Sequence, residues 1–151
     1  MSRWNSIDEI LDLAIGEEKA AAEFYTQLAG QVKTPGMRQV LEGFAQEEMK
    51  HKAKLETIKA GGTLRPAQQQ VMDLKIADYV VDVAPSQDMS YQGALVLAMK
   101  KEKAAFKLYT DLAAKTEDAG LRETFQALAM EEARHKLRFE VEYDDYVLRG
   151  Y

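Results

Sequence analysis

The chain has 151 residues, the size of one domain with one hydrophobic core. A balance of 46% hydrophobic and 30% charged residues is ordinary for a globular protein, and no apolar run is long enough to cross a bilayer. Cysteine is absent, which excludes disulfides and thiolate metal sites, and a formal charge of −5 disfavours nucleic acid as a partner. We expect one cytoplasmic domain over residues 1–151 that binds neither a membrane nor nucleic acid.

Helical spacing and end signals predict two long helices in the first part of the chain. The first covers about residues 6–30 and opens at Ser6 with a capping-box pattern. The second covers about residues 34–60 and opens at Thr34, with Pro35 in the first helical position and two glycines just after its end. The short interval between the helices predicts an antiparallel hairpin.

The same signals predict a second hairpin after a long crossover over about residues 62–88. Residues 71–83 of the crossover are apolar enough to form a short helix that packs against the other helices, since a long loop without structure is unusual. The third long helix covers about 90–115. The fourth covers about 118–147 and opens at Asp118, a good N-cap. The fold class predicted is all-α.

The chain repeats itself with an offset of 84 residues. Over positions 18–51, 14 of 34 residues are identical to their counterparts. Any two amphipathic helices share apolar spacing, but that similarity does not explain shared positions of rare residues such as histidine. Two repeated helical hairpins joined by a long crossover predict a four-helix bundle.

Both histidines of the chain lie three residues after a glutamate, as Glu48 with His51 and Glu132 with His135. Residues at i and i+3 share one helix face and can bind one metal ion. One such pair is weak evidence, because surface helices contain many of them. Two pairs in register within a repeat are much stronger evidence.

Two further glutamates lie at matching places in the partner helices. Glu18 precedes Glu48 by 30 residues, and Glu102 precedes Glu132 by the same interval, with both midpoints in predicted turns. Residues equidistant from the turn of an antiparallel hairpin lie side by side. If the hairpins pack antiparallel, all six residues can meet at one level.

The six ionisable residues lie at positions of the apolar stripe of each helix where the 3–4 spacing predicts hydrophobic side chains. The four stripes consist of Leu11, Ala14, Glu18, Ala21, Tyr25 and Leu28; Met37, Leu41, Phe44, Glu48, His51, Leu55 and Ile58; Leu95, Ala98, Glu102, Ala105, Tyr109 and Leu112; and Leu121, Phe125, Leu128, Glu132, His135 and Phe139. The alternative is that the ionisable residues are solvated surface charges. Four buried carboxylates would be costly unless neutralised, and two divalent cations with neutral imidazoles balance their charge.

The ligand types indicate which metals suit the site. Carboxylates and imidazoles suit iron or manganese, and zinc would also bind. A structural zinc site would prefer cysteines. We therefore predict two iron ions, with manganese or zinc as substitutes.

Four motifs carry a family resemblance. They are Glu18-x-x-Ala21-x-x-Phe24-Tyr25, Glu48-x-x-His51, Glu102-x-x-Ala105-x-x-Leu108-Tyr109 and Glu132-x-x-His135. The pattern resembles the ferritin-like superfamily and looks most like the di-iron domain of rubrerythrins. The resemblance covers the four helices and implies the same six metal ligands, which would also be the catalytic residues. It implies an oxidoreductase that reduces H₂O₂, as rubrerythrins do, or oxidises ferrous iron with O₂, as ferritins do.

The chain departs from rubrerythrins in two ways. It has no cysteines for the rubredoxin module that usually supplies electrons, so we expect an external donor such as a rubredoxin-like protein. The extra glutamate one turn after the third-helix ligand is replaced by Ala105, matched by Ala21, so the site looks symmetric. The tail after Val147 is too short for the fifth helix of a bacterioferritin cage, so we do not expect a large cage. We expect a homodimer.

Several roles stay open at this point. Tyr25 and Tyr109 lie seven residues after their glutamates and are either core aromatics or groups that bond a ligand carboxylate or supply an electron. Glu47 and Glu131 either hold the histidine rings or are solvated. For the whole chain, the alternatives are a non-catalytic metal-binding protein and a helical interaction module with a vestigial site.

Overall fold

The structure is a computed structural model that describes residues 7–62, 64, 74–81, 83–86 and 89–149. Its elements in chain order are α1 (Ile7–Gln31), α2 (Pro35–Gly61), the 3₁₀ turn η2 (Ile76–Asp78), α4 (Tyr91–Lys115) and α5 (Ala119–Arg149). The described residues contain no extended strand. The predicted all-α class and the four long helices are confirmed, and each helix boundary lies within two residues of its expected place.

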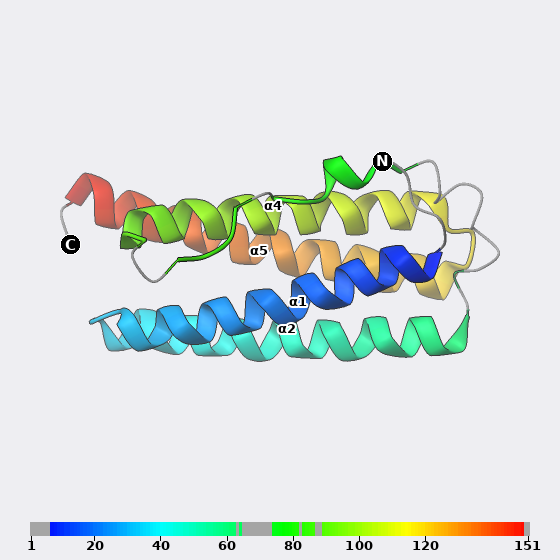
Figure 1. Ribbon diagram of the computed structural model, residues 1–151, viewed down its shortest axis with the longest axis horizontal. Helices are drawn as coiled ribbons and strands as arrows, with labels where there is room; N and C mark the ends of the chain where they lie inside the picture. Colours follow the sequence, from blue (N-terminus) through cyan, green and yellow to red (C-terminus); the bar gives the residue numbers. More distant parts are fainter. Residues whose placement is uncertain (1–6, 63, 65–73, 82, 87–88, 150–151) are drawn as a thin grey trace. The chain divides into compact units, whose positions relative to one another are not determined.

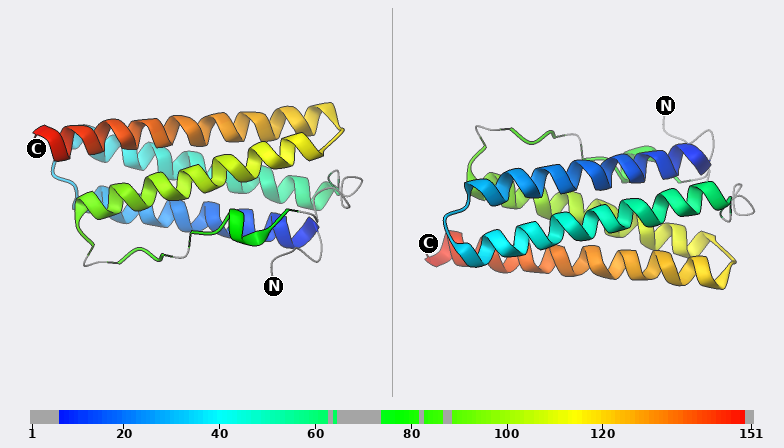
Figure 2. Two further views of the ribbon diagram at one scale, coloured as in Figure 1. Left: turned by 90° about the horizontal axis from the view of Figure 1, so that it is seen from above. Right: turned by 90° about the horizontal axis from the view of Figure 1, so that it is seen from below.

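The described residues fall into two compact units. One unit contains α1 and α2, and the other contains η2, α4 and α5. Within each unit the two long helices run antiparallel and lie side by side, as Figures 1 and 2 show. The two predicted hairpins are therefore present.

The ends of α2 follow the predicted signals. Thr34 is extended, with φ −84° and ψ 124°, and Pro35 takes the first helical position, where a missing N–H costs nothing. The helix stops at Gly62, whose φ of 66° lies in the left-handed region that glycine adopts without a steric penalty. Its N–H donates to the carbonyls of Ile58 and Lys59.

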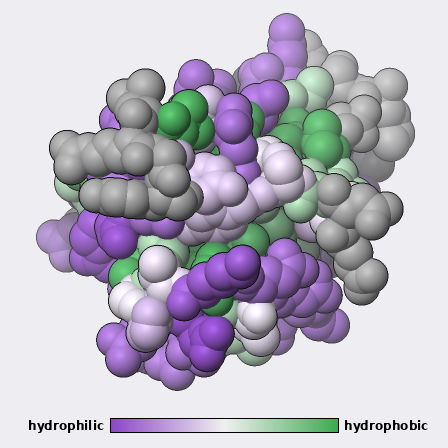
Figure 3. All heavy atoms as spheres, turned by 90° about the vertical axis from the view of Figure 1, so that its left-hand side faces the viewer, coloured by the Kyte–Doolittle hydropathy of each residue, from purple (hydrophilic) through white to green (hydrophobic). Residues whose placement is uncertain are grey.

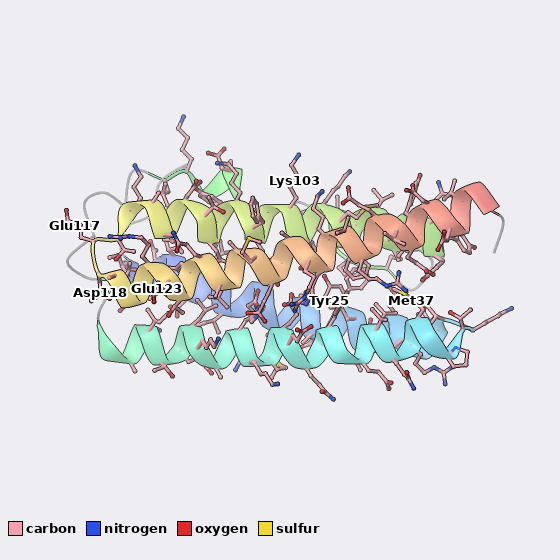
Figure 4. The ribbon with its side chains drawn as sticks, turned by 180° about the vertical axis from the view of Figure 1, so that it is seen from behind. Tyr25, Met37, Lys103, Glu117, Asp118 and Glu123 are labelled. Atoms are coloured by element: carbon pink, nitrogen blue, oxygen red, sulfur yellow. The ribbon has the colours of Figure 1, made fainter. Side chains whose placement is uncertain are left out.

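The starts of α4 and α5 are capped by side chains. The Ser90 hydroxyl accepts a hydrogen bond from the Gly93 N–H at 3.0 Å. Asp118, at the turn between α4 and α5 in Figure 4, accepts one from the Leu121 N–H through Oδ1 at 2.7 Å. Both bonds satisfy N–H groups that have no partner within the helix. Ser6, the expected cap of the first helix, lies outside the described residues.

A repeated arginine fastens the turn of each hairpin. Arg38 donates from Nη2 to the carbonyl of Val32 at 3.3 Å. Its counterpart Arg122 donates from Nε and Nη2 to the carbonyl of Thr116, at 3.4 and 3.3 Å, and from Nη2 to that of Glu117 at 3.1 Å. In both units, therefore, the arginine side chain binds backbone carbonyls of the turn that precedes its own helix.

The described part of the crossover packs against α4. Tyr79 is buried, and its hydroxyl donates to Asp111 Oδ2 at 2.7 Å. Lys107 lies over the Tyr79 ring and pairs with Asp111 at 3.0 Å. The short helix expected over residues 71–83 is, in its described part, only the single turn η2; residues 65–73 lie outside the described ones.

The inward faces of the helices are the predicted apolar stripes, with two differences. Phe44 is half-buried, and Ala45 is buried on α2 in its place. Ala105 is half-buried, whereas its counterpart Ala21 is buried. Charged and polar residues dominate the surface, with a few apolar residues between them, as Figure 3 shows for one face. No helix in the described part of the chain has the length and apolar character needed to cross a bilayer.

The two arginines generate a prediction about stability. Charge-assisted hydrogen bonds to carbonyls contribute more than neutral ones, and Arg122 makes three where Arg38 makes one. We expect Arg122→Ala to lower the free energy of unfolding by about 1 kcal/mol and Arg38→Ala by about half as much. Urea denaturation of the two variants measures this difference. Equal losses would contradict it, and Arg122→Lys, which keeps the charge without the planar fork, should recover only part of the loss.

Candidate metal centre

The α1–α2 unit contributes three buried ionisable side chains. Glu18 comes from α1, and Glu48 and His51 come from α2, with exposures of 2%, 0% and 1%. Nδ1 of His51 lies 2.9 Å from Oε2 of Glu18 and 3.1 Å from Oε1 of Glu48. One potential ligand atom from each side chain lies within 4.8 Å of the others, which is the spacing of groups that can share a metal ion. We call these residues the first triad.

The α4–α5 unit contains the same arrangement, the second triad. Glu102 comes from α4, and Glu132 and His135 come from α5, with exposures of 1%, 0% and 0%. Nδ1 of His135 lies 2.9 Å from Oε2 of Glu102 and 3.5 Å from Oε1 of Glu132. The ligand atoms of this triad also lie within 4.8 Å of one another.

The local geometry explains why the triads form. Glu48 and His51 are three residues apart on one helix face, and Glu18 reaches them from the neighbouring helix at the same distance from the turn. The sequence predicted that Glu18 lies beside Glu48, and the structure adds that both carboxylates meet at one imidazole nitrogen. Lys103, next to Glu102 in sequence, points outward from α4 in Figure 4, whereas Glu102 is buried, because adjacent positions of a helix lie on different faces.

The electrostatics of the first triad favour a proton on His51. Burial lowers the pKa of His51, but hydrogen bonds and charge from Glu18 and Glu48 more than offset that effect and raise it to about 10. Nδ1 is the imidazole nitrogen that lies between the two carboxylates, 2.9 Å from Glu18 Oε2 and 3.1 Å from Glu48 Oε1. Nδ1 of His51 is therefore the position at which a proton and a metal cation would compete.

The donor chemistry of each triad fits a divalent cation. Two carboxylates and one neutral imidazole provide hard oxygen ligands and one borderline nitrogen, a set that suits iron, manganese or zinc. The cation would replace the Nδ1 proton and balance both carboxylate charges within a core that excludes water. Glu18, Glu48 and His51 would hold one ion, and Glu102, Glu132 and His135 the other.

The two tyrosines singled out in the sequence are buried. Tyr25 and Tyr109 have exposures of 0% and 1%. The Tyr25 ring meets Phe44 edge-on with centroids 6.4 Å apart, and the Tyr109 ring stacks on Phe125 at the same distance. These contacts support the interpretation as core aromatics. A role for either phenol toward a ligand carboxylate stays a prediction.

Other residues of the site were placed less fully by the sequence. Glu47 and Glu131, next to the triad glutamates, are half-buried. Whether they hold the histidine rings stays open. Sequence reasoning did not predict that Arg38 and Arg122 bind the turns of their hairpins. The sequence showed these arginines only as a repeated residue, each two positions after a repeated glycine.

Comparison with known proteins decides the family. A family model for rubrerythrin matches residues 9–143, most of the chain and all six triad residues. The chain belongs to the rubrerythrin family. No curated protein gives a significant sequence match. The resemblance inferred from the motifs is confirmed.

A solved structure supports the fold of this rubrerythrin-family chain. A Thermotoga maritima protein, described with its 2.30 Å crystal structure as a putative ferritin-like diiron-carboxylate protein, superimposes with a TM-score of 0.74. The match covers 93% of this chain and 95% of that one at 18% sequence identity, which is evidence for the fold alone. The ferritin-like four-helix fold is therefore confirmed.

The proton on His51 generates a prediction about pH. Because the folded pKa of about 10 lies above the ordinary 6.5, the stability that His51 contributes to the metal-free protein is complete below about pH 6.5 and is lost as the pH rises through about 10. Metal-free protein should therefore lose stability over this range. His51→Gln should remove this part of the loss.

Thermal melts of metal-free parent and variant between pH 6 and pH 10 make the comparison. A parent whose melting temperature falls no more steeply with pH than that of His51→Gln would contradict the assignment of the proton. Calorimetric titration of Mn²⁺ in two buffers of different ionisation enthalpy gives an independent check, since binding should release protons near neutral pH.

Proposed function

We propose that the two triads together form one binuclear centre that holds two iron ions and reacts with H₂O₂ or O₂. The observation that carries the proposal is the duplication: two buried triads of identical composition, each built by a helical hairpin of the same design. Membership of the rubrerythrin family supports iron as the metal. The similar Thermotoga maritima protein, named as a diiron-carboxylate protein, supports it further.

Charge supports two metal ions and argues against one. The four triad glutamates carry four negative charges when ionised, and all are at most 2% exposed. Two divalent ions balance them when both histidines are neutral, whereas one ion would leave two charges uncompensated in a region of low dielectric. Protonation of His51 can compensate part of that charge only when no ion occupies its triad.

The chain's own residues have clear roles in this proposal. The carboxylates of Glu18 and Glu102 reach across their hairpins and clamp the histidine-bearing helix to its neighbour. The imidazoles exchange a proton for a cation at Nδ1, which couples metal loading to pH. When bound, two adjacent iron ions can supply two electrons to one oxidant without releasing a radical.

The choice between the oxidants and the identity of the reductant belong to the same proposal. Peroxide reduction follows the rubrerythrins, and ferroxidase activity follows the symmetric ligand set, because alanines occupy positions 21 and 105. Electrons would come from an external donor such as a rubredoxin-like protein. Manganese or zinc would compete for the same ligands, and the cytoplasm is the expected location.

The first prediction from this proposal concerns stoichiometry. Full-length protein should bind two Fe²⁺ or Mn²⁺ ions per chain, measured by metal analysis after equilibrium dialysis under anaerobic conditions. Glu48→Gln and Glu132→Gln should each lose at least one ion, because each removes a ligand and a compensating charge. The substitutions Glu56→Gln and Glu140→Gln, at solvent-accessible and corresponding positions of the same two helices, are matched controls and should keep two. One ion per chain, unchanged in all four variants, would overturn the binuclear centre.

The second prediction concerns chemistry. The ferrous ions in protein loaded anaerobically with two equivalents of Fe²⁺ should be oxidised by H₂O₂ at least about tenfold faster than free Fe²⁺ in the same buffer, since two ferrous ions held together can supply both electrons to one peroxide molecule. Stopped-flow absorbance measures the rate, and a parallel experiment with O₂ separates peroxidase from ferroxidase behaviour. Equal rates with and without the protein would favour a metal-binding protein without catalysis.

A further inference from the structure

A solvent-exposed groove lies between the two helices of the α1–α2 hairpin. Its volume is about 700 Å³, and its surface is mostly apolar. Ala22 of α1 and Ala45 of α2 line it with exposures of 5% and 7%, so these two small side chains form its floor. Met49, which is 47% exposed, forms part of one wall. Sites that bind small organic molecules have volumes of roughly 300–1,000 Å³, so the groove has the size of such a site.

Two glutamates line the groove from opposite helices. Glu23 of α1 and Glu42 of α2 are both exposed. Glu23 precedes Lys33, the middle of the hairpin, by ten residues, and Glu42 follows it by nine, so the two carboxylates lie at nearly the same level. Among the described residues, neither carboxylate has a hydrogen bond or an ion pair, and no basic side chain lines the groove. The groove therefore carries two negative charges that its own lining does not balance.

The other polar side chains of the groove are neutral. The hydroxyl of Thr26 donates to the carbonyl of Ala22 at 2.8 Å, so its proton is already used within α1. Gln27 and Gln46 supply amides, which bind a charged group less strongly than a carboxylate does. The two glutamates are therefore the groups that decide the charge of a ligand, and they favour a cation.

The internal repeat shows that these features are not required by a metal triad. At the corresponding positions of the α4–α5 hairpin, Lys107 and Gln126 replace the two glutamates. Phe106 replaces Ala22, so the second hairpin carries a phenyl ring where the first has only a methyl group. A ring at this position is therefore compatible with the hairpin design. The two negative charges and the small side chain at position 22 are particular to the first hairpin, although both hairpins bear a triad of the same composition.

We propose that the groove binds a small organic cation of the arylalkylamine class, in which a short carbon chain joins an aromatic ring to an ammonium group. The ring lies over Ala22 and Ala45, beside Met49, whose thioether makes favourable contacts with aromatic rings. The ammonium group lies between the carboxylates of Glu23 and Glu42, which accept charge-assisted hydrogen bonds from it. The two carboxylates repel an anion, and a bare metal ion leaves the apolar floor without a partner.

The open shape of the groove sets the expected affinity. One side of a bound ring stays in contact with solvent, and both carboxylates are exposed, so water and salt weaken their attraction for a cation. We therefore expect a dissociation constant on the order of 0.1–1 mM for 2-phenylethylamine at low ionic strength. The affinity should fall as salt is added.

A comparison of three ligands tests the chemistry of the site. 2-Phenylethylamine has both the ring and the charge, 2-phenylethanol has the ring without the charge, and propylamine has the charge without the ring. Each is titrated into the isotope-labelled full chain and followed by two-dimensional NMR. The arylalkylamine should shift the backbone amides of residues 22–27 and 42–49. It should bind at least about fivefold more tightly than either comparison ligand, because each of those lacks one of the two interactions. The same result is expected after Zn²⁺ is added, because no triad residue lines the groove.

Substitutions in the groove test its position. Ala22→Phe gives α1 the ring that α4 carries at the corresponding position, and it should weaken binding of 2-phenylethylamine at least about tenfold, because the ring occupies the floor of the site. The double variant Glu23→Gln/Glu42→Gln should weaken it about fivefold, to an affinity near that of 2-phenylethanol, because it removes both charges.

Two control variants match these changes elsewhere in the chain. Phe106→Ala alters the corresponding position of α4, and Glu56→Gln/Glu123→Gln removes two exposed negative charges outside the groove. Both should keep the affinity within about twofold of the parent, because neither touches the site. No saturable binding up to about 10 mM would overturn the proposal. So would equal affinities for the amine and the alcohol, shifts confined to residues outside the groove, or an Ala22→Phe variant that binds as the parent does.

These measurements are separate from the proposed redox function. Circular dichroism melts of each variant confirm that it is folded, and metal content is measured alongside. If Ala22→Phe does not fold, the glutamate double variant and the ligand comparison still decide the question. Loss of amine binding with metal content retained concerns the groove alone, and loss of metal with amine binding retained concerns the triads alone.

Discussion

The burial of two carboxylates and one imidazole from each helical hairpin is the constraint on which the rest of the structure depends. No triad residue is more than 2% exposed. Leaving such groups charged and unpartnered in a core would cost several kcal/mol each. In the first triad, the carboxylates lie 2.9 and 3.1 Å from Nδ1 of His51, so a protonated imidazole offsets part of this cost, and a divalent cation in the same place would offset it more fully. In the first triad, folding stability and metal binding therefore both depend on what Nδ1 of His51 binds, a proton or a metal ion.

The duplication extends this constraint to the whole chain and shows where the two halves have diverged. Both hairpins keep the triad, the buried tyrosine and the arginine that fastens the turn. They differ on their outer surfaces. The α4–α5 unit packs Tyr79 of the crossover against α4 and exposes Met130 and Leu137 on α5, whereas the corresponding residues of α2, Gln46 and Ala53, are polar or small. The metal ligands are thus common to the two hairpins, and the outer surfaces are where the hairpins differ.

The sequence predicted most of the fold and the composition of the triads, because both depend on local periodicity. Helix ends follow from Pro35, Gly62 and Asp118, and the triads follow from the i, i+3 spacing and equal distances from the turns. It did not predict which imidazole nitrogen faces the carboxylates, or that the pKa of His51 is raised, since these depend on rotamers and on the balance of burial against charge. The prediction that Phe44 is buried was wrong, because Phe44 and Ala45 both lie at the edge of the apolar stripe of α2. Periodicity does not distinguish these two positions, and in the structure Ala45 is the buried one.

The central claim is that each triad holds one metal ion and that the two ions form one centre. The most direct measurement is a crystal structure of the full chain grown with Mn²⁺ or anaerobic Fe²⁺, with anomalous scattering recorded at the absorption edge of the metal. The account predicts two anomalous peaks per chain, one bound by Glu18, Glu48 and His51 and one by Glu102, Glu132 and His135, each with Nδ1 of its histidine as a ligand. A single peak, peaks at surface carboxylates, or triads that keep their imidazole–carboxylate contacts at saturating metal would contradict it.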